Sequence, residues 1–340
     1  MIDRDLMLLF LMAMPASLLL CVFACHWIIP ILRRHKIGQH IYTEYGPAWH
    51  AGKQGTPTMG GICFIIPMLL CILTYVIFES IRGVRDPLSQ DPNLIPLALC
   101  ISLGVGNAMI GFVDDYAKLL HKQNQGLSSW QKLLLQAIVA GLYVYGMTAC
   151  GSMPTVLEIA FLGIRWDLGV AYYALAVLMI LAMVNSTNLT DGLDGLASSV
   201  ALMAALCTTV MAFCFADASS VLICAVMIGG MIGFLVFNHY PAKVFMGDTG
   251  SLYLGGIFMG LGFMLRQPVL MILICGVFVL DMLSSFAQIL SYKLFKKRIF
   301  KMAPVHHHFE KMGWSEVRIV YAFSAVGLIF GALGVLLALL

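Results

Sequence analysis

The sequence predicts an all-α polytopic membrane protein with about ten transmembrane helices. Of its 340 residues, 61% are hydrophobic and only 11% are charged, and the mean hydropathy is +0.92. Soluble domains are about 45–50% apolar and about 25% charged, so this composition excludes an ordinary soluble enzyme and a disordered chain. Apolar runs of about 20 residues match the thickness of a bilayer. Inside the bilayer each run must be a helix, because only a helix satisfies its own backbone polar groups.

The expected spans belong to a single integral membrane domain over residues 1–340. The first run follows an N-terminus without the basic segment of a signal peptide, so we expect it to remain as a helix. Residues 151–168 alternate weakly and predict a small hairpin around Gly163. The ten spans are 6–32, 59–78, 94–113, 133–150, 169–185, 196–216, 220–237, 251–266, 269–292 and 317–340.

Charge is distributed unevenly between the two sets of loops that ten spans create. One set carries 15 of the 20 Lys and Arg residues. The positive-inside rule places this set in the cytoplasm and both termini in the periplasm. A basic face beside the bilayer suits anionic headgroups and phosphates, although membrane topology alone gives the same excess. The cytoplasmic loops, which we expect to form the active face, are 33–58, 114–132, 185–195, 238–250 and 293–318.

The second and third spans carry the first two motifs on this face. Lys53-Gln-Gly-Thr-Pro-Thr-Met-Gly-Gly61 opens the second span, where Pro57 and the glycines suit a helix start that offers amides to an anion. The third span ends in Gly111-Phe-Val-Asp-Asp-Tyr-Ala-Lys118. Two adjacent carboxylates repel each other unless a cation lies between them, and Mg²⁺ prefers such oxygen ligands beside phosphate. Adjacent helical residues point about 100° apart, so we expect the two acids to take different roles. A solvated helix end is the simpler alternative.

The next two cytoplasmic loops add acids flanked by glycines. The first of these loops reads Asn185-Ser-Thr-Asn-Leu-Thr-Asp-Gly-Leu-Asp-Gly195. Its acids can bind a ribose, a base or a metal, or the segment is simply a turn before a helix. The second loop reads Asn238-His-Tyr-Pro-Ala-Lys-Val-Phe-Met-Gly-Asp-Thr-Gly-Ser251. Asp248 in this loop is either the N-cap of the next helix or a metal ligand beside a phosphate at the helix N-terminus.

The ninth span and the loop after it carry the remaining polar residues. Asp281, Ser284, Ser285, Gln288 and Tyr292 follow helical spacing toward the cytoplasm. They predict either a polar groove for a lipid phosphate or hydrogen bonds between helices. The loop contains an internal triple histidine whose spacing is poor for zinc. We expect its imidazoles to bind the oxygens of a diphosphate. These residues are His306, His307 and His308.

With these motifs the chain resembles the phospho-N-acetylmuramoyl-pentapeptide transferases, a branch of the polyprenyl-phosphate sugar-1-phosphate transferases. The Gly-Phe-Val-Asp-Asp-Tyr, Asn-Leu-Thr-Asp-Gly-Leu-Asp-Gly and Met-Gly-Asp-Thr-Gly-Ser strings are typical of the superfamily. Thr-Pro-Thr-Met-Gly-Gly and Met-Ala-Pro-Val-His-His-His-Phe-Glu are typical of the muramoyl-pentapeptide branch. The chain differs at Tyr42, where the family usually has Arg, and at Asp281, where it tends to have Glu.

The resemblance implies a reaction, a cofactor and a set of site residues. It implies Mg²⁺-dependent transfer of phospho-MurNAc-pentapeptide from UDP-MurNAc-pentapeptide to undecaprenyl phosphate at the cytoplasmic face of the bacterial inner membrane. Asp114, Asp115 and Asp248 match the family's catalytic acids, with Asp248 the Mg²⁺ ligand. A homodimer is expected from the resemblance alone, and no nucleic acid is expected as a partner. The matched substrate-binding positions and basic residues are Lys53, Thr58, Lys118, Lys132, Asn188, Asp191, Asp194, Asn238, Phe245, Gln288 and His307.

Several alternatives stay open at this point. The lipid phosphate attacks the β-phosphate of the donor directly, or the reaction passes through a phospho-enzyme on Asp114 or Asp115. A related enzyme that transfers GlcNAc-1-phosphate is the nearest alternative function, although the triple histidine argues against it. A secondary transporter is disfavoured, because transporters place ionisable groups near the midplane of the membrane and here only Asp281 lies deep in a span.

Overall fold

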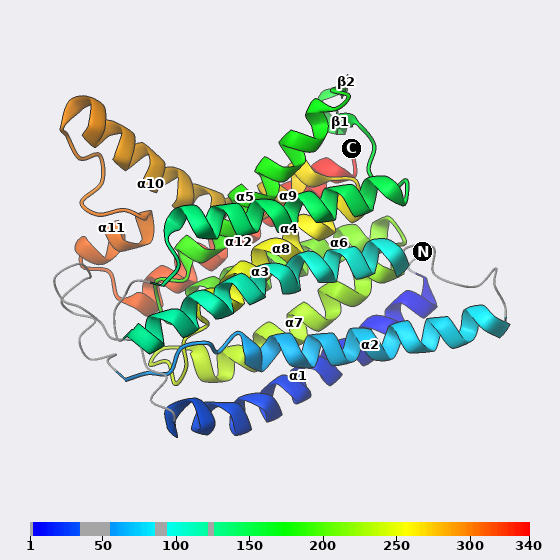
Figure 1. Cartoon of the computed structure of the whole chain (residues 1–340), viewed down its shortest axis with the longest axis horizontal. Helices are drawn as coiled ribbons and strands as arrows, with labels where there is room; N and C mark the ends of the chain where they lie inside the picture. Colours follow the sequence, from blue (N-terminus) through cyan, green and yellow to red (C-terminus); the bar gives the residue numbers. More distant parts are fainter. Residues whose placement is uncertain (1–2, 35–54, 86–93, 122–125) are drawn as a thin grey trace.

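The computed structural model describes residues 3–34, 55–85, 94–121 and 126–340 of the chain. The helices run nearly side by side along the longest axis of the molecule (Figure 1). Among the described residues, nine helices are long and apolar enough to cross a membrane, which confirms a nearly all-α, multi-pass membrane fold. These nine are α1 (Arg4–Arg34), α2 (Ile62–Arg85), α3 (Leu94–His121), α4 (Ser129–Ala149), α5 (Ala171–Thr190), α6 (Leu196–Cys214), α7 (Ala218–Asn238), α10 (Gly276–Phe295) and α12 (Glu316–Ala338).

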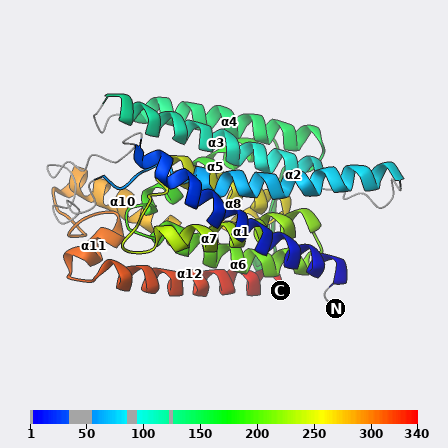
Figure 2. The same cartoon turned by 90° about the horizontal axis from the view of Figure 1, so that it is seen from below.

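Three further helices and a hairpin complete the described chain. The helices are α8 (Gly247–Met264), α9 (Pro268–Ile274) and α11 (Val305–Lys311). The expected hairpin around Gly163 is confirmed, with β1 (Val156–Ile159) paired antiparallel to β2 (Ile164–Asp167) through a short 3₁₀ turn, η3 (Ala160–Leu162). This hairpin lies at the end of the bundle where α1 begins and α12 ends (Figure 1), and the N and C labels lie together at that end in Figure 2. The two ends of the chain therefore share one side of the bundle.

Two expected spans differ from the observed helices. The eighth was expected at 251–266, but α8 starts at Gly247, so Asp248 lies in its first turn, and α8 is not among the nine apolar helices. The ninth was expected as one helix over 269–292, but it is divided at Cys275, whose ψ of 19° departs from helical values. The glycine that follows Cys275 has a low helix propensity, which makes this a favourable place for a break. After the break, α10 leaves the bundle at an angle (Figure 1).

Helix α8 forms the core of the bundle. Every residue from Thr249 to Phe263 is buried, and α3, α5 and α2 all pack against the helix. Helix α7 is also largely buried, between α1, α6 and α2. The outer helices present large apolar side chains, such as those of Leu19, Leu142 and Ile329, to the surroundings, as expected for a surface in contact with lipid.

Glycines allow α3 and α8 to approach at the level of their backbones. A Cβ atom added to Gly111 would lie 2.2 Å from the carbonyl oxygen of Asp248 and 2.6 Å from the backbone nitrogen of Thr249. Small residues at such crossings are the usual way in which membrane helices pack closely. Because Asp114 and Asp115 follow Gly111 within about one turn, this approach also brings them next to the start of α8.

Substituting Gly111 by alanine is therefore expected to destabilise the protein by about 1–3 kcal/mol, because the methyl group would force the two backbones apart. The measurement is the midpoint of thermal unfolding in detergent. Gly141→Ala on α4 is the matched control, since a Cβ atom there meets nothing within 4 Å. Equal midpoints for the two variants would contradict the close packing of α3 on α8.

Candidate functional site

Three carboxylates meet where α3 crosses the first turn of α8. One oxygen from each of Asp114, Asp115 and Asp248 lies within 4.8 Å of the others, close enough to hold a metal ion. Asp114 and Asp115 are only 2% and 4% exposed, so the simpler alternative of a solvated helix end is wrong. Helix α3 runs to His121, which places both acids on the helix. Their oxygens converge more closely than expected for neighbouring helical residues. We call these three residues the aspartate cluster.

Asp115 caps the N-terminus of α8 from the neighbouring helix. Its Oδ2 accepts hydrogen bonds from the backbone N–H of Thr249 at 3.0 Å and from the Thr249 hydroxyl at 2.8 Å. Its Oδ1 accepts one from the backbone N–H of Asp248 at 3.3 Å. The first N–H groups of a helix have no hydrogen-bond partner within the helix. In α8 the Asp115 carboxylate, which belongs to α3, accepts hydrogen bonds from two of them. Asp248 is therefore not the N-cap, and its own carboxylate faces other side chains.

Asp114 holds the connection between α3 and α4. Its Oδ1 accepts a hydrogen bond from the backbone N–H of Leu127 at 2.8 Å. Its Oδ2 forms ion pairs with the Nζ of Lys118 at 2.6 Å and of Lys132 at 3.3 Å. The start of α4 is defined by a capping box between Ser128 and Gln131, which places Lys132 in the first turn of that helix.

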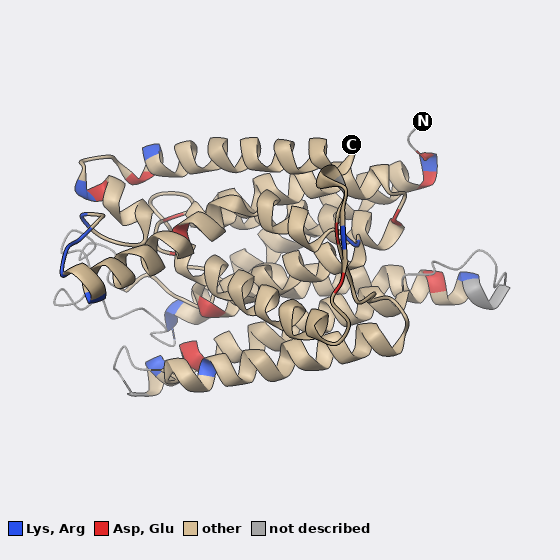
Figure 3. Ribbon diagram, turned by 90° about the horizontal axis from the view of Figure 1, so that it is seen from above, with Lys and Arg blue, Asp and Glu red and all other residues tan. Residues whose placement is uncertain are grey.

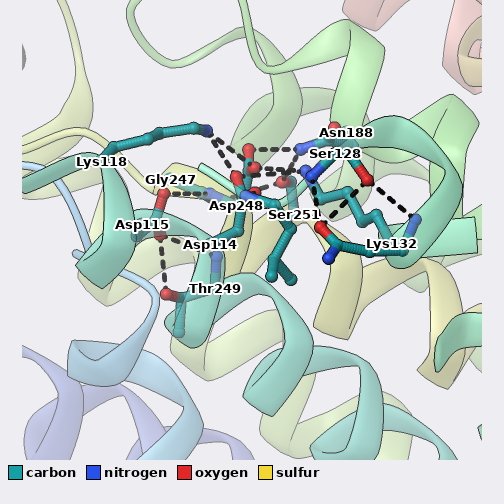
Figure 4. Close-up of polar contacts among 12 residues, drawn as sticks. Asp114, Asp115, Lys118, Ser128, Lys132, Asn188, Gly247, Asp248, Thr249 and Ser251 are labelled. Carbon is teal, nitrogen blue, oxygen red and sulfur yellow. Dashed lines mark hydrogen bonds and ion pairs between the residues drawn. The ribbon is translucent and has the colours of Figure 1, made fainter. Parts of the chain in front are cut away.

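The Asp248 carboxylate forms ion pairs with lysines from two helices, α3 and α4. Its Oδ2 lies 3.0 Å from the Nζ of Lys118 and 2.5 Å from that of Lys132. Asn188 on α5 donates a hydrogen bond to Oδ1 at 2.7 Å and another to the Ser251 hydroxyl at 2.9 Å. Figure 4 shows these side chains converging on Asp248. With 16% of its side chain exposed, Asp248 is the most accessible acid of the cluster.

Asp191 lies directly after α5, beside the aspartate cluster. Burial raises the pKa of its carboxyl, and the negative charges of Asp248 and Asp115 raise it further, to about 8. A hydrogen bond from the backbone N–H of Gly247 opposes these effects. Since excess negative charge contributes to the raised pKa, a cation bound among these acids would lower it.

Asp194 and Asn238 bind the backbone segment that leads into α8. Asp194 Oδ2 accepts a hydrogen bond from the N–H of Ala242 at 2.9 Å. The Asn238 side chain donates to the carbonyl of Val244 at 2.9 Å and accepts from the Ser198 hydroxyl at 2.7 Å. Both predicted substrate-binding residues therefore make contacts that position this segment, and contact with a substrate stays a prediction for them.

Thr58 and Phe245 lie at the entry to α8, and Lys53 lies outside the described residues. Gly247 has φ +71°, and a Cβ atom there would lie 2.7 Å from Asp115 Oδ2 and 2.8 Å from the Thr58 hydroxyl. Phe245 is half-buried, and its backbone pairs with Pro57 at 2.8 Å and with Gly60 at 2.9 Å. The start of α2 is thus joined to the start of α8, as expected if both belong to one site.

The three histidine rings do not share one target. His306 is buried, with its Nδ1 2.7 Å from Asp281 Oδ2 and its Nε2 against Gly192, where an added Cβ atom would lie 2.5 Å away. His307 Nδ1 lies 2.6 Å from Glu310 Oε2, and His308 Nδ1 accepts a hydrogen bond from the backbone N–H of Lys301 at 3.0 Å. The three rings thus contact different partners, and the binding of diphosphate oxygens by these imidazoles stays a prediction.

The polar side chains of α10 bind the segment that follows the helix. Ser284 accepts a hydrogen bond from the N–H of Val305 at 2.9 Å. Gln288 accepts from the backbone N–H groups of Ile299 and Phe300 at 3.0 and 2.9 Å. Of the two interpretations of this polar stripe, the structure supports hydrogen bonding over an open groove. Substrate binding by Gln288 stays a prediction.

Sequence analysis missed two polar residues one turn deeper in the bundle. Asn185 on α5 donates a hydrogen bond to Gln136 Oε1 on α4 at 2.8 Å. Gln136 follows Lys132 by four residues, and its amide nitrogen is buried without a hydrogen-bond partner among the described residues. A lone glutamine in an apolar run, at helical spacing from a basic residue, was the available signal.

Comparison with known proteins identifies the family. Residues 97–266 match the model of glycosyl transferase family 4, and residues 53–65 match signature 1 of the phospho-N-acetylmuramoyl-pentapeptide-transferases. A protein of Heliobacterium modesticaldum with that name is 43% identical over 313 residues, which cover 92% of each chain. One of Bacillus subtilis with the same name is 40% identical over 335 residues, which cover 98% of each chain.

The matched family segment includes the aspartate cluster, both lysines and Asn188, and the signature includes Thr58 and the start of α2. The identity of 40–43% to these relatives extends over 92–98% of the chain. On these grounds the chain belongs to the phospho-N-acetylmuramoyl-pentapeptide-transferase family.

Proposed function

We propose that the protein transfers phospho-MurNAc-pentapeptide from UDP-MurNAc-pentapeptide to undecaprenyl phosphate, which releases UMP and forms lipid I. The aspartate cluster with its two lysines carries the proposal, because it suits a reaction between two phosphate groups. Repulsion between anions is the main obstacle to such a reaction, and cations at fixed positions reduce it. The name of the relatives supplies the phospho-MurNAc-pentapeptide group, and the family resemblance supplies its UDP carrier and the undecaprenyl phosphate acceptor.

The donor set fits Mg²⁺. Three carboxylate oxygens within 4.8 Å of one another are hard ligands of the kind that this ion prefers. Asp248 is the proposed principal ligand, because it is the most accessible of the three. Bound there, Mg²⁺ would neutralise charge on the diphosphate. Lys118 and Lys132 would then be released from Asp248 to contact phosphate oxygens, and Asn188 would hold the Asp248 carboxylate in place.

Direct attack by the lipid phosphate is the route that the contacts favour. Both oxygens of Asp115 accept hydrogen bonds from α8, and both oxygens of Asp114 are engaged by Leu127 and the lysines. Such contacts stabilise the anionic form of both carboxylates and lower their nucleophilicity, which favours direct attack over a phospho-enzyme. The second pKa of a phosphate monoester is about 6, so the acceptor is largely a dianion near pH 7 and needs no strong general base.

The proposed location is the inner membrane, with the site on its cytoplasmic face. The aspartate cluster lies at the end of α3 and the start of α8, away from the end of the bundle where the chain begins and finishes (Figure 1). More of the Lys and Arg positions, coloured blue, lie at that same end than at the other (Figure 3). The positive-inside rule then places it in the cytoplasm. The homodimer remains a prediction.

The test is UMP release by the detergent-purified protein given undecaprenyl phosphate and UDP-MurNAc-pentapeptide, with Mg²⁺ or with EDTA. We expect release that requires Mg²⁺ and is absent with UDP-GlcNAc as the donor. Release with UDP-GlcNAc alone would assign the protein to the related sugar-phosphate transferases. No release with either donor, from folded protein, would contradict the proposal. Label retained on the protein after incubation with donor alone would overturn direct attack.

A further inference from the structure

A cavity lies at the same end of the bundle as the aspartate cluster. Its volume is about 840 Å³, within the range of about 300–1,000 Å³ that is common for ligand sites. Its walls come from the α7–α8 connection, from the segment between α10 and α11, and from the end of α11 with the start of α12. The wall residues used below are Tyr240, Lys301, Glu310, Lys311, Trp314 and Glu316.

The wall carries two lysines and two glutamates, which differ in their partners. Lys301 and Lys311 are exposed, and their ammonium groups form no ion pair with any described residue. Both acids are engaged instead: Glu310 contacts His307 at 2.6 Å, and Glu316 accepts a hydrogen bond from the backbone N–H of Asp194 at 3.3 Å. The two lysines are therefore the charged residues of this wall that can pair with an anionic group of a ligand.

The cavity is connected to the aspartate cluster through short, well-bonded segments. At one end of α11, His306 packs against Gly192, which directly follows Asp191. At the other end of α11 lies Lys311, about 8 Å further along the helix. The hydrogen bond between Glu316 and Asp194 joins the opposite wall to the same loop. The cavity wall is therefore in direct contact with the loop that carries Asp191 and Asp194.

A peptide is the ligand that fits both the reach and the charge. Five extended residues span up to about 17 Å, which exceeds the length of α11 between His306 and Lys311. A peptide also ends in a carboxylate, the natural partner of an unpaired lysine ammonium. Trp314, with the Arg318 guanidinium 4.1 Å from its ring centre, provides a rigid apolar wall for side chains.

We propose that this cavity binds the peptide arm of the donor, with Lys301 and Lys311 contacting its terminal carboxylate. This inference rests on the proposed function, which supplies a donor that carries a pentapeptide. The nucleotide and diphosphate remain at the aspartate cluster, so the two parts of the donor occupy different parts of the protein. Selectivity for a peptide-bearing donor then resides in the residues around α11.

The test measures binding rather than turnover. Calorimetry without lipid acceptor gives the dissociation constants of three ligands. These are UDP-MurNAc-pentapeptide, the same donor with an amidated peptide C-terminus, and peptide-free UDP-MurNAc. For the wild-type protein we expect the intact pentapeptide donor to bind about tenfold more tightly than either of the others. For the double variant Lys301→Glu/Lys311→Glu we expect this advantage to disappear. Lys297→Glu, an exposed lysine outside the cavity, is the matched control and should keep it.

The outcomes separate this inference from the proposed function. If the wild-type protein binds none of the three ligands, the proposed function fails. The inference is overturned if the wild-type protein binds all three ligands equally, or if the double variant weakens the binding of all three equally. In either case the protein binds the nucleotide but does not use this cavity for the peptide. Normal thermal unfolding of the double variant shows that any loss of binding does not come from misfolding.

Discussion

Asp248→Asn is expected to lower the rate of UMP release by about 1,000-fold. The substitution keeps the size of the side chain but removes the charge that faces Lys118, Lys132 and the proposed metal. A loss of this size corresponds to about 4 kcal/mol of transition-state stabilisation, which is reasonable for a ligand of a catalytic cation. The measurement is UMP release over a range of Mg²⁺ concentrations, since a weakened metal site would require more Mg²⁺ for half-maximal rate.

Asp217→Asn is the matched control for this variant. Asp217 is also buried, but it lies between α6 and α7, the full length of α6 away from the site, and contacts Ser220. We expect it to keep its activity and its Mg²⁺ requirement. Full activity of Asp248→Asn would contradict the assignment of Asp248 as the principal metal ligand.

Asp281→Ala is expected to destabilise the protein by about 3–5 kcal/mol, the usual cost of removing one partner of a buried ionisable pair. Asp281 and His306 have no exposed surface and lie 2.7 Å apart. The His306 Nε2 has no hydrogen-bond partner among the described residues, so loss of Asp281 would leave both ring nitrogens without a hydrogen-bond partner there. The measurement is the midpoint of thermal unfolding in detergent.

Two further variants show whether the buried pair is responsible. Ser285→Ala lies one turn from Asp281, and its hydroxyl bonds only to that residue's carbonyl at 3.4 Å, so we expect a small change. Replacing both partners, as in Asp281→Leu/His306→Leu, should recover much of the stability, because no unpaired polar group remains. An unchanged midpoint for Asp281→Ala would refute the importance of the contact.

Hydropathy predicted the membrane helices well because burial in lipid depends on composition, which is a local property. The exceptions have physical causes. The first turn of α8, Gly247 to Gly250, is polar and was expected to be a loop, because the residue that caps it, Asp115, lies 133 positions earlier in the chain. The break at Cys275 interrupts an unbroken apolar run, so its hydropathy gave no sign of it.

The candidate site was predictable in its acids and less so in its histidines. Asp114, Asp115 and Asp248 stood out because charge beside an apolar helix is costly without a partner. The partners themselves, such as Asp281 for His306, depend on tertiary contacts that no spacing reveals. The three histidines also occupy successive positions on α11, where side chains point about 100° apart, so they had to diverge.

The enclosure of α8 bears on how the ribosome and translocon deliver this chain to the bilayer. A segment with six glycines and an aspartate in its first turn is a weak signal for insertion, and α8 is not among the nine described helices that are long and apolar enough to cross a membrane. Helices α2, α3 and α5 are synthesised earlier and supply the surfaces that α8 covers. Insertion of α8 is thus coupled to assembly: it enters a pocket of protein prepared by its predecessors, and the aspartate cluster forms at the moment it docks.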